Sequence, residues 1–225
     1  MKIDSHQHFW HPARGDYYWM DGEGAAPIRR AIGPDEMRPH LKAAGVDKTV
    51  LVQAAPTVNE TEYMLGIADT TGFVAKVVGW VDFEKREDLK HLQRLARHPK
   101  FAGVRPMIQD LPDAEWMHRK DIQWAYDAIA DLDLTFDALG YAHHVGPFRR
   151  LFDARPKMRI VIDHCMKPVI RDGKFDDWAR GMETIAKTTN VFCKLSGIAT
   201  EAKPGWTVET LKPYARHVID CFGPG

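Results

Sequence analysis

Residues 3–10 read Ile-Asp-Ser-His-Gln-His-Phe-Trp, and this stretch decides between two folds that the rest of the sequence allows. We expect a first β-strand here, and the turn that follows, His6-Gln7-His8-Phe9-Trp10, contains no glycine. A dinucleotide-binding sheet needs a glycine-rich turn after its first strand. The segment therefore favours a closed parallel barrel over an open, doubly wound sheet.

The same first strand begins a regular alternation of strand-like and helix-like segments. Seven apolar runs rich in Val, Ile, Phe or Leu predict strands at Lys2–Phe9, Lys48–Ala54, Phe73–Asp82, Phe101–Arg105, Leu134–Leu139, Met158–His164 and Val191–Leu195. Amphipathic stretches predict helices at Thr57–Asp69, Glu87–His98, Lys120–Leu132, Pro147–Ala154, Asp176–Lys187 and Pro213–Phe222. Such alternation is typical of right-handed strand-helix-strand units in an α/β protein.

Composition limits the kinds of partner that this chain can have. Its 31 Lys and Arg residues balance its 31 Asp and Glu residues in a well-mixed pattern, which argues against nucleic-acid and membrane partners. The amino terminus lacks the apolar stretch of a signal peptide, so we expect a cytoplasmic protein. The three cysteines, Cys165, Cys193 and Cys221, are far apart, and we expect reduced thiols. The sequence does not indicate an oligomeric state.

Length and strand count together predict an incomplete barrel. A (β/α)8 TIM-type barrel has eight strands and typically about 250 residues, whereas this chain of 225 residues offers seven predicted strands. We therefore expect one barrel domain over residues 1–225, incomplete at its C-terminal end and lacking the eighth strand and helix.

The histidines of the first strand are the leading candidates for chemistry. His6 and His8 are two residues apart, so their side chains point to the same side of the strand. Barrel enzymes place their active sites at the carboxyl ends of the strands, where paired imidazoles could bind a metal ion or polarise a carbonyl group. The alternative is that both histidines are satisfied by hydrogen bonds and serve only the structure.

Polar residues at other strand ends add to this candidate site. His164 ends the sixth predicted strand, and Arg105 ends the fourth, where its guanidinium could contact a substrate or form a structural ion pair with Asp137. Lys194 could bind an anionic or hydroxylated substrate, and Trp10 could cover a sugar-like ring. A solvated lysine and a tryptophan that only packs its own loop are the alternatives for the last two.

Several motifs, taken in order, resemble those of a known family. They are residues 3–10, Gly103-Val104-Arg105-Pro106-Met107-Ile108-Gln109-Asp110, Ile162-Asp163-His164-Cys165-Met166-Lys167-Pro168 and Cys193-Lys194-Leu195-Ser196-Gly197. Together they resemble the sugar-lactone hydrolases of the amidohydrolase superfamily, in particular the L-fuconolactonase-like group. The resemblance extends over essentially the whole chain.

The resemblance implies a distorted (β/α)8 barrel that hydrolyses a small lactone such as L-fuconolactone. It implies His6, His8 and His164 as catalytic residues, and Arg105 near the substrate. Trp10 and Lys194 remain substrate-binding candidates on their own residue types and positions. Superfamily members with two metals have a lysine or glutamate after strand four and a histidine after strand five, where this chain has Arg105 and Asp137. The resemblance is compatible with one divalent ion bound by His6 and His8, and also with no metal ion. We expect that no metal ion is required.

Two further expectations follow from the same resemblance. The family's water-activating aspartate follows strand eight, and no such segment occurs here, so the chain as given is expected to be inactive as a lactonase. The alternatives to an aldonolactone hydrolase are a lactonase or decarboxylase of aromatic catabolism from the same superfamily, and a catalytically inactive, truncated binding protein.

Overall fold

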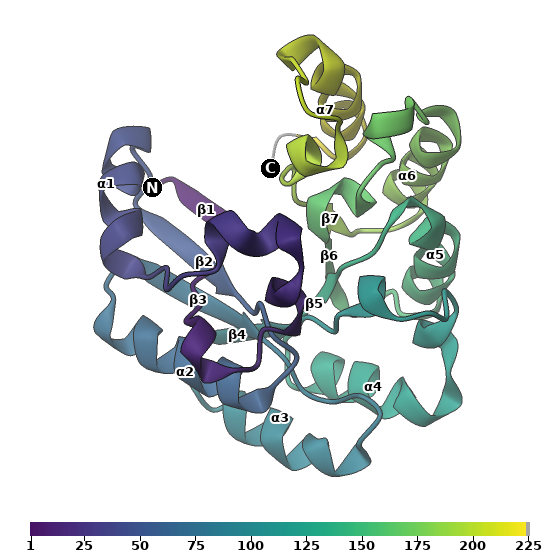
Figure 1. Ribbon diagram of the computed structural model, residues 1–225. Helices are drawn as coiled ribbons and strands as arrows, with labels where there is room; N and C mark the ends of the chain where they lie inside the picture. Colours follow the sequence, from purple (N-terminus) through teal and green to yellow (C-terminus); the bar gives the residue numbers. More distant parts are fainter. Residues whose placement is uncertain (224–225) are drawn as a thin grey trace. The chain divides into compact units, whose positions relative to one another are not determined.

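The computed structural model describes residues 1–223 and divides the chain into two compact units. The first unit is Met1–Arg105, and the second begins at Pro106. The strands and helices of both units are labelled in Figure 1. Seven strands occur in the described residues, as the alternation predicts.

The first unit is a four-stranded parallel sheet with helices between its strands (Figure 1). Its elements are β1 (Ile3–Gln7), α1 (Pro34–Ala44), β2 (Lys48–Val52), α2 (Val58–Thr70), β3 (Val74–Gly79), α3 (Leu89–Leu95) and β4 (Phe101–Val104). The strands pair in chain order, and α2 packs against β3. Leu51, Val77 and Met64 are fully buried between sheet and helix. Burial of such apolar side chains is what holds this unit together.

The second unit repeats the same strand-helix alternation. Its elements are α4 (Gln123–Asp131), β5 (Thr135–Ala138), α5 (Val145–Ala154), β6 (Arg159–Ile162), α6 (Asp176–Thr188), β7 (Phe192–Cys193) and α7 (Val208–Phe222). Strands β5, β6 and β7 are parallel neighbours in that order, and α6 packs against both α5 and α7. In the described part of the chain, no helix has the length and apolarity needed to cross a membrane.

Helices α1 and α7 show where the sequence prediction missed a helix or its start. Helix α1 was not predicted, although Pro34 starts it and Gly45 ends it in the left-handed conformation, a common arrangement at helix ends. Helix α7 begins at Val208 rather than at Pro213, because Thr207 caps the helix and hydrogen-bonds with Thr210. Pro213 thus lies inside the helix rather than at its start.

Candidate active site

The end of β1 brings two imidazoles together. His6 Nε2 lies 3.1 Å from His8 Nε2, and the ring centroids are 4.8 Å apart, in agreement with the two-residue period of the strand. His8 Nδ1 donates a hydrogen bond to the carbonyl oxygen of Val52 at 2.7 Å. A carbonyl can only accept, so Nδ1 carries the proton and Nε2 of neutral His8 presents a lone pair. Two lone pairs repel, and the 3.1 Å contact therefore needs a proton or a cation between the two nitrogens.

Arg105 places a fixed positive charge beside this pair. It follows β4, is only 3% exposed, and has Nη1 at 3.4 Å from His6 Nε2. Its Nη2 donates to the carbonyl oxygen of Gln53, while the Gln53 side chain donates to the Arg105 carbonyl oxygen at 2.8 Å. These two bonds join the ends of β2 and β4 and hold the guanidinium toward His6. The carboxyl ends of β1, β2 and β4 thus meet at one polar cluster of the first unit.

The loop after β2 is organised by Glu60, a residue of α2. Thr57 caps α2, since its hydroxyl accepts a hydrogen bond from the Glu60 backbone N–H at 3.0 Å. The Glu60 carboxylate instead accepts hydrogen bonds from the backbone N–H groups of Ala54 and Ala55, at 2.8 to 3.0 Å. A fully buried carboxylate therefore fixes the loop that adjoins Gln53.

Trp10 lies in the long loop that follows β1. Its indole N–H donates to the carbonyl oxygens of Ile28 and Arg30, and its ring makes an edge contact with Trp19 at 5.6 Å. The Trp10 ring centroid is 6.5 Å from that of His8. Trp10 thus packs against residues of its own loop and also lies near His8.

The second unit holds a buried charge cluster around Lys194. The Lys194 ammonium lies 2.5 Å from Asp137 Oδ2 and 3.0 Å from Asp163 Oδ1. The lysine side chain is 8% exposed, and the two carboxylates are 1% and 0% exposed. Lys194 therefore bridges acids at the ends of β5 and β6, a structural role that its position after β7 did not reveal.

His164 follows β6, one residue after Asp163, and is half-buried. Its Nδ1 lies 2.9 Å from the hydroxyl oxygen of Ser196, which comes from the loop after β7. The sequence offered no role for Ser196. The hydrogen bond holds one ring nitrogen and thereby fixes the orientation of the imidazole.

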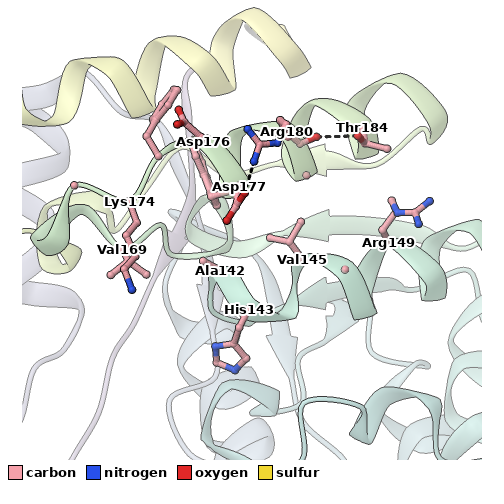
Figure 2. A pocket seen from close by; sticks show the side chains of 15 residues that line it. Ala142, His143, Val145, Arg149, Val169, Lys174, Asp176, Asp177, Arg180 and Thr184 are labelled. Carbon is pink, nitrogen blue, oxygen red and sulfur yellow. Dashed lines mark hydrogen bonds and ion pairs between the residues drawn. The ribbon is translucent and has the colours of Figure 1, made fainter.

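A separate hollow of about 820 Å³ opens between α5 and α6. Figure 2 shows Arg149, Lys174 and Arg180 around it, with Arg180 paired to Asp177. Its lining comes from residues 142–149 and 169–184 and includes none of the six site residues predicted from the sequence. Those six divide between the units: the first contains His6, His8, Trp10 and Arg105, and the second contains His164 and Lys194. That the two groups act together stays a prediction.

Sequence and fold comparisons agree on the class of protein. The family profile named Amidohydrolase matches residues 3–225, and the chain belongs to this family. A relative from Burkholderia ambifaria, named L-fucono-1,5-lactonase, is 43% identical over 222 residues, which are 99% of this chain and 76% of the relative. A second L-fucono-1,5-lactonase, from Burkholderia multivorans, is 30% identical and is aligned over 79% of its length, with 100% of this chain covered.

Solved structures confirm the fold class. An amidohydrolase from Burkholderia multivorans, crystallised with bound HEPES, covers 100% of this chain and 81% of its own, with a TM-score of 0.92 and 28% identity. A second crystal form, described with bound zinc, gives a TM-score of 0.90 and 29% identity, again over 100% of this chain and 81% of that one. The chain therefore has the α/β, TIM-type fold of an amidohydrolase, with seven strands in its described residues.

Proposed function

We propose that this protein hydrolyses a sugar lactone, an aldonolactone such as L-fuconolactone, to the open acid. The observation that carries the proposal is 43% identity to an L-fucono-1,5-lactonase over 99% of this chain. The reaction is the attack of water on the lactone carbonyl, followed by departure of the ring oxygen. The small-molecule lactone is the only partner that this proposal requires.

The first unit supplies groups suited to an ester carbonyl. The Arg105 guanidinium is a fixed donor whose charge would stabilise an oxyanion as it develops. The Nε2 lone pair of neutral His8 can accept a proton but cannot donate one, so we assign His8 to proton transfer from water or to metal binding. His6, between His8 and Arg105, would orient both.

The second unit contributes His164 to the proposed reaction. Its Nδ1 is held by Ser196, and we assign the opposite ring nitrogen, Nε2, to the reaction. Asp137 and Asp163 are not assigned as general bases, because both are buried and bound by the Lys194 ammonium. We therefore propose that Lys194 holds these two carboxylates in place and does not itself bind the lactone.

His6 and His8 also form a donor set that fits one divalent ion. Their Nε2 atoms are 3.1 Å apart, close to the separation of two nitrogens that each lie about 2.0–2.1 Å from a shared zinc ion. Such an ion would act as a Lewis acid toward the carbonyl oxygen. The guanidinium 3.4 Å from His6 Nε2 opposes a second cation there, and we propose that a bound metal is not required.

The test is to follow acid release from a panel of aldonolactones, with an aromatic pyrone lactone as the competing substrate class. We expect the sugar lactones to be hydrolysed faster than the pyrone, and turnover by the 225-residue chain would overturn the sequence-based expectation that this chain is inactive. His8→Ala should lower turnover by about 10²-fold or more, the usual effect of losing a general acid-base group. His11→Ala removes an exposed imidazole three residues away and is the matched control. Equal turnover by His8→Ala and His11→Ala would refute the role of His8.

A further inference from the structure

The backbone that carries His164 adopts an uncommon conformation. His164, Cys165, Met166 and Lys167 all have positive φ angles, of 51°, 54°, 56° and 43°. A side chain with a Cβ disfavours this left-handed region, and single residues rather than runs normally occupy it. Strained backbone of this kind persists only when the surroundings impose it, and it concentrates at functional sites. Contacts from elsewhere must therefore hold this turn.

The loop after β7 provides those contacts. Ile162 pairs with Cys193, and the Lys194 backbone N–H donates to the Ile162 carbonyl oxygen at 2.9 Å. The Cys165 thiol in turn reaches the Lys194 carbonyl oxygen at 3.4 Å. This pairing places residues 196 and 197 beside the left-handed turn.

Gly197 has room for the His164 ring only because it lacks a side chain. A Cβ at position 197 would lie 2.7 Å from His164 Nδ1 and 2.9 Å from its Cγ, closer than real Cβ contacts allow. The preceding residue, Ser196, has its hydroxyl 2.9 Å from the same Nδ1. One residue thus gives the imidazole its space and its neighbour gives it a hydrogen bond.

We propose that Ser196 and Gly197 are positioning residues for His164. The Ser196 hydroxyl fixes the ring orientation and directs Nε2 away from the loop, while Gly197 allows the ring to lie against the backbone. That the positioned imidazole acts on a lactone rests on the proposed function. The positioning itself rests only on contacts within the second unit.

A stability cycle tests the role of Gly197 without any activity assay. Gly173 is a matched control, because it also has a φ of 65° but has nothing within 4 Å of an added Cβ. Both Gly197→Ala and Gly173→Ala should therefore lose stability because alanine disfavours a positive φ. Only the Cβ of Gly197→Ala should clash with the His164 imidazole. We expect Gly197→Ala to lower Tm more than Gly173→Ala, and the excess to disappear when both are made in a His164→Ala background. An excess that persists without the imidazole would overturn the proposal.

The hydroxyl of Ser196 is tested by kinetics. Ser196→Ala should lower kcat about tenfold or more, as for losing the partner that orients a functional histidine, and should leave KM within about twofold. Ser196→Thr keeps a hydroxyl and should restore most of kcat. Thr188→Ala, which removes a hydroxyl that donates to the Thr184 carbonyl oxygen of its own helix, is the control. Ser196→Ala with wild-type kcat would contradict the proposal.

The two experiments separate the two ideas. A protein that hydrolyses no lactone, but shows the stability excess and its loss in the His164→Ala background, would refute the proposed function and support the positioning. The opposite result is also possible. Lactone turnover that does not change in Ser196→Ala, with an extra loss of Tm in Gly197→Ala that persists without the imidazole, would support the proposed function and refute the positioning.

Discussion

Glu60 is the buried acid of the first unit whose charge state should control stability. Burial raises the pKa of Glu60 from its ordinary value of 4.5 to about 7, although the backbone N–H groups of Ala55 and Ala54 favour the charged form. Between these two values the folded protein keeps a proton that the unfolded chain releases. The free energy of unfolding therefore falls as pH rises through this interval and levels off above it.

Glu60→Gln should remove this pH dependence. Relative to the variant, the wild-type protein should lose up to about 3 kcal/mol of stability between pH 4.5 and 7, at 1.36 kcal/mol per unit of pKa shift. Urea unfolding at a series of pH values measures the difference. Glu62→Gln, on the same helix but paired with Arg94 at the surface, is the control and should leave the dependence in place.

Lys194 is the second residue whose charge we expect to matter. Burial opposes its ammonium form, but the carboxylates of Asp137 and Asp163 outweigh burial and raise the pKa of Lys194 above 10.5. A raised pKa in a base stabilises the folded state at pH values below 10.5, and this contribution is lost only as pH rises through the raised value. The lysine therefore remains charged at neutral pH.

Lys194→Met should be strongly destabilising. It leaves two buried carboxylates without their cation, a change that typically costs about 3–5 kcal/mol. Lys187→Met, which breaks an exposed pair with Glu183, should change stability far less, because solvent screens such pairs. Chemical unfolding at pH 7 compares the two variants. Similar losses would show that the buried cluster is not held by Lys194.

At the scale of elements, the alternation of strands and helices was predictable because it depends on local apolar periods. The ends of elements were less so. Strand β7 was predicted over Val191–Leu195 but spans Phe192–Cys193. The Ser196 backbone N–H donates to the Lys194 carbonyl oxygen at 3.0 Å. The chain therefore leaves the β-sheet soon after Cys193. The pattern of apolar residues in the sequence does not predict such a turn.

The cap of α2 offers a prediction at the same scale. Thr57 accepts the Glu60 N–H and donates to Asp16 Oδ2, both at 3.0 Å. Thr57→Ala should therefore destabilise the protein by about 1 kcal/mol, the usual effect of losing a helix cap. Thr57→Ser keeps the hydroxyl and should recover most of the stability. Thermal unfolding of both variants checks this, and equal losses would mean that the methyl group matters instead.

At the scale of the whole molecule, the sequence predicted which residues end the strands but not what those residues bind. The pairing of His6 with His8 follows from a two-residue spacing, and the structure has it. The contact of Lys194 with Asp137 joins residues 57 positions apart. Long-range contacts of this kind depend on strand register, which a single sequence does not give. Ser196 and Gly197 were missed as functional candidates for that reason, since they contact His164 across more than 30 positions.

The metal requirement of the whole protein depends on the same kind of long-range contact. The facing nitrogens of His6 and His8 need either a proton or a metal ion between them, and the guanidinium of Arg105 favours the smaller charge of the proton. Dialysis against a chelator should therefore leave lactone turnover within about twofold, a change below 0.5 kcal/mol in the barrier. Metal analysis of the purified protein and the turnover rate before and after dialysis measure this. Loss of turnover that one equivalent of zinc restores would show instead that His6 and His8 hold a catalytic ion despite the neighbouring arginine.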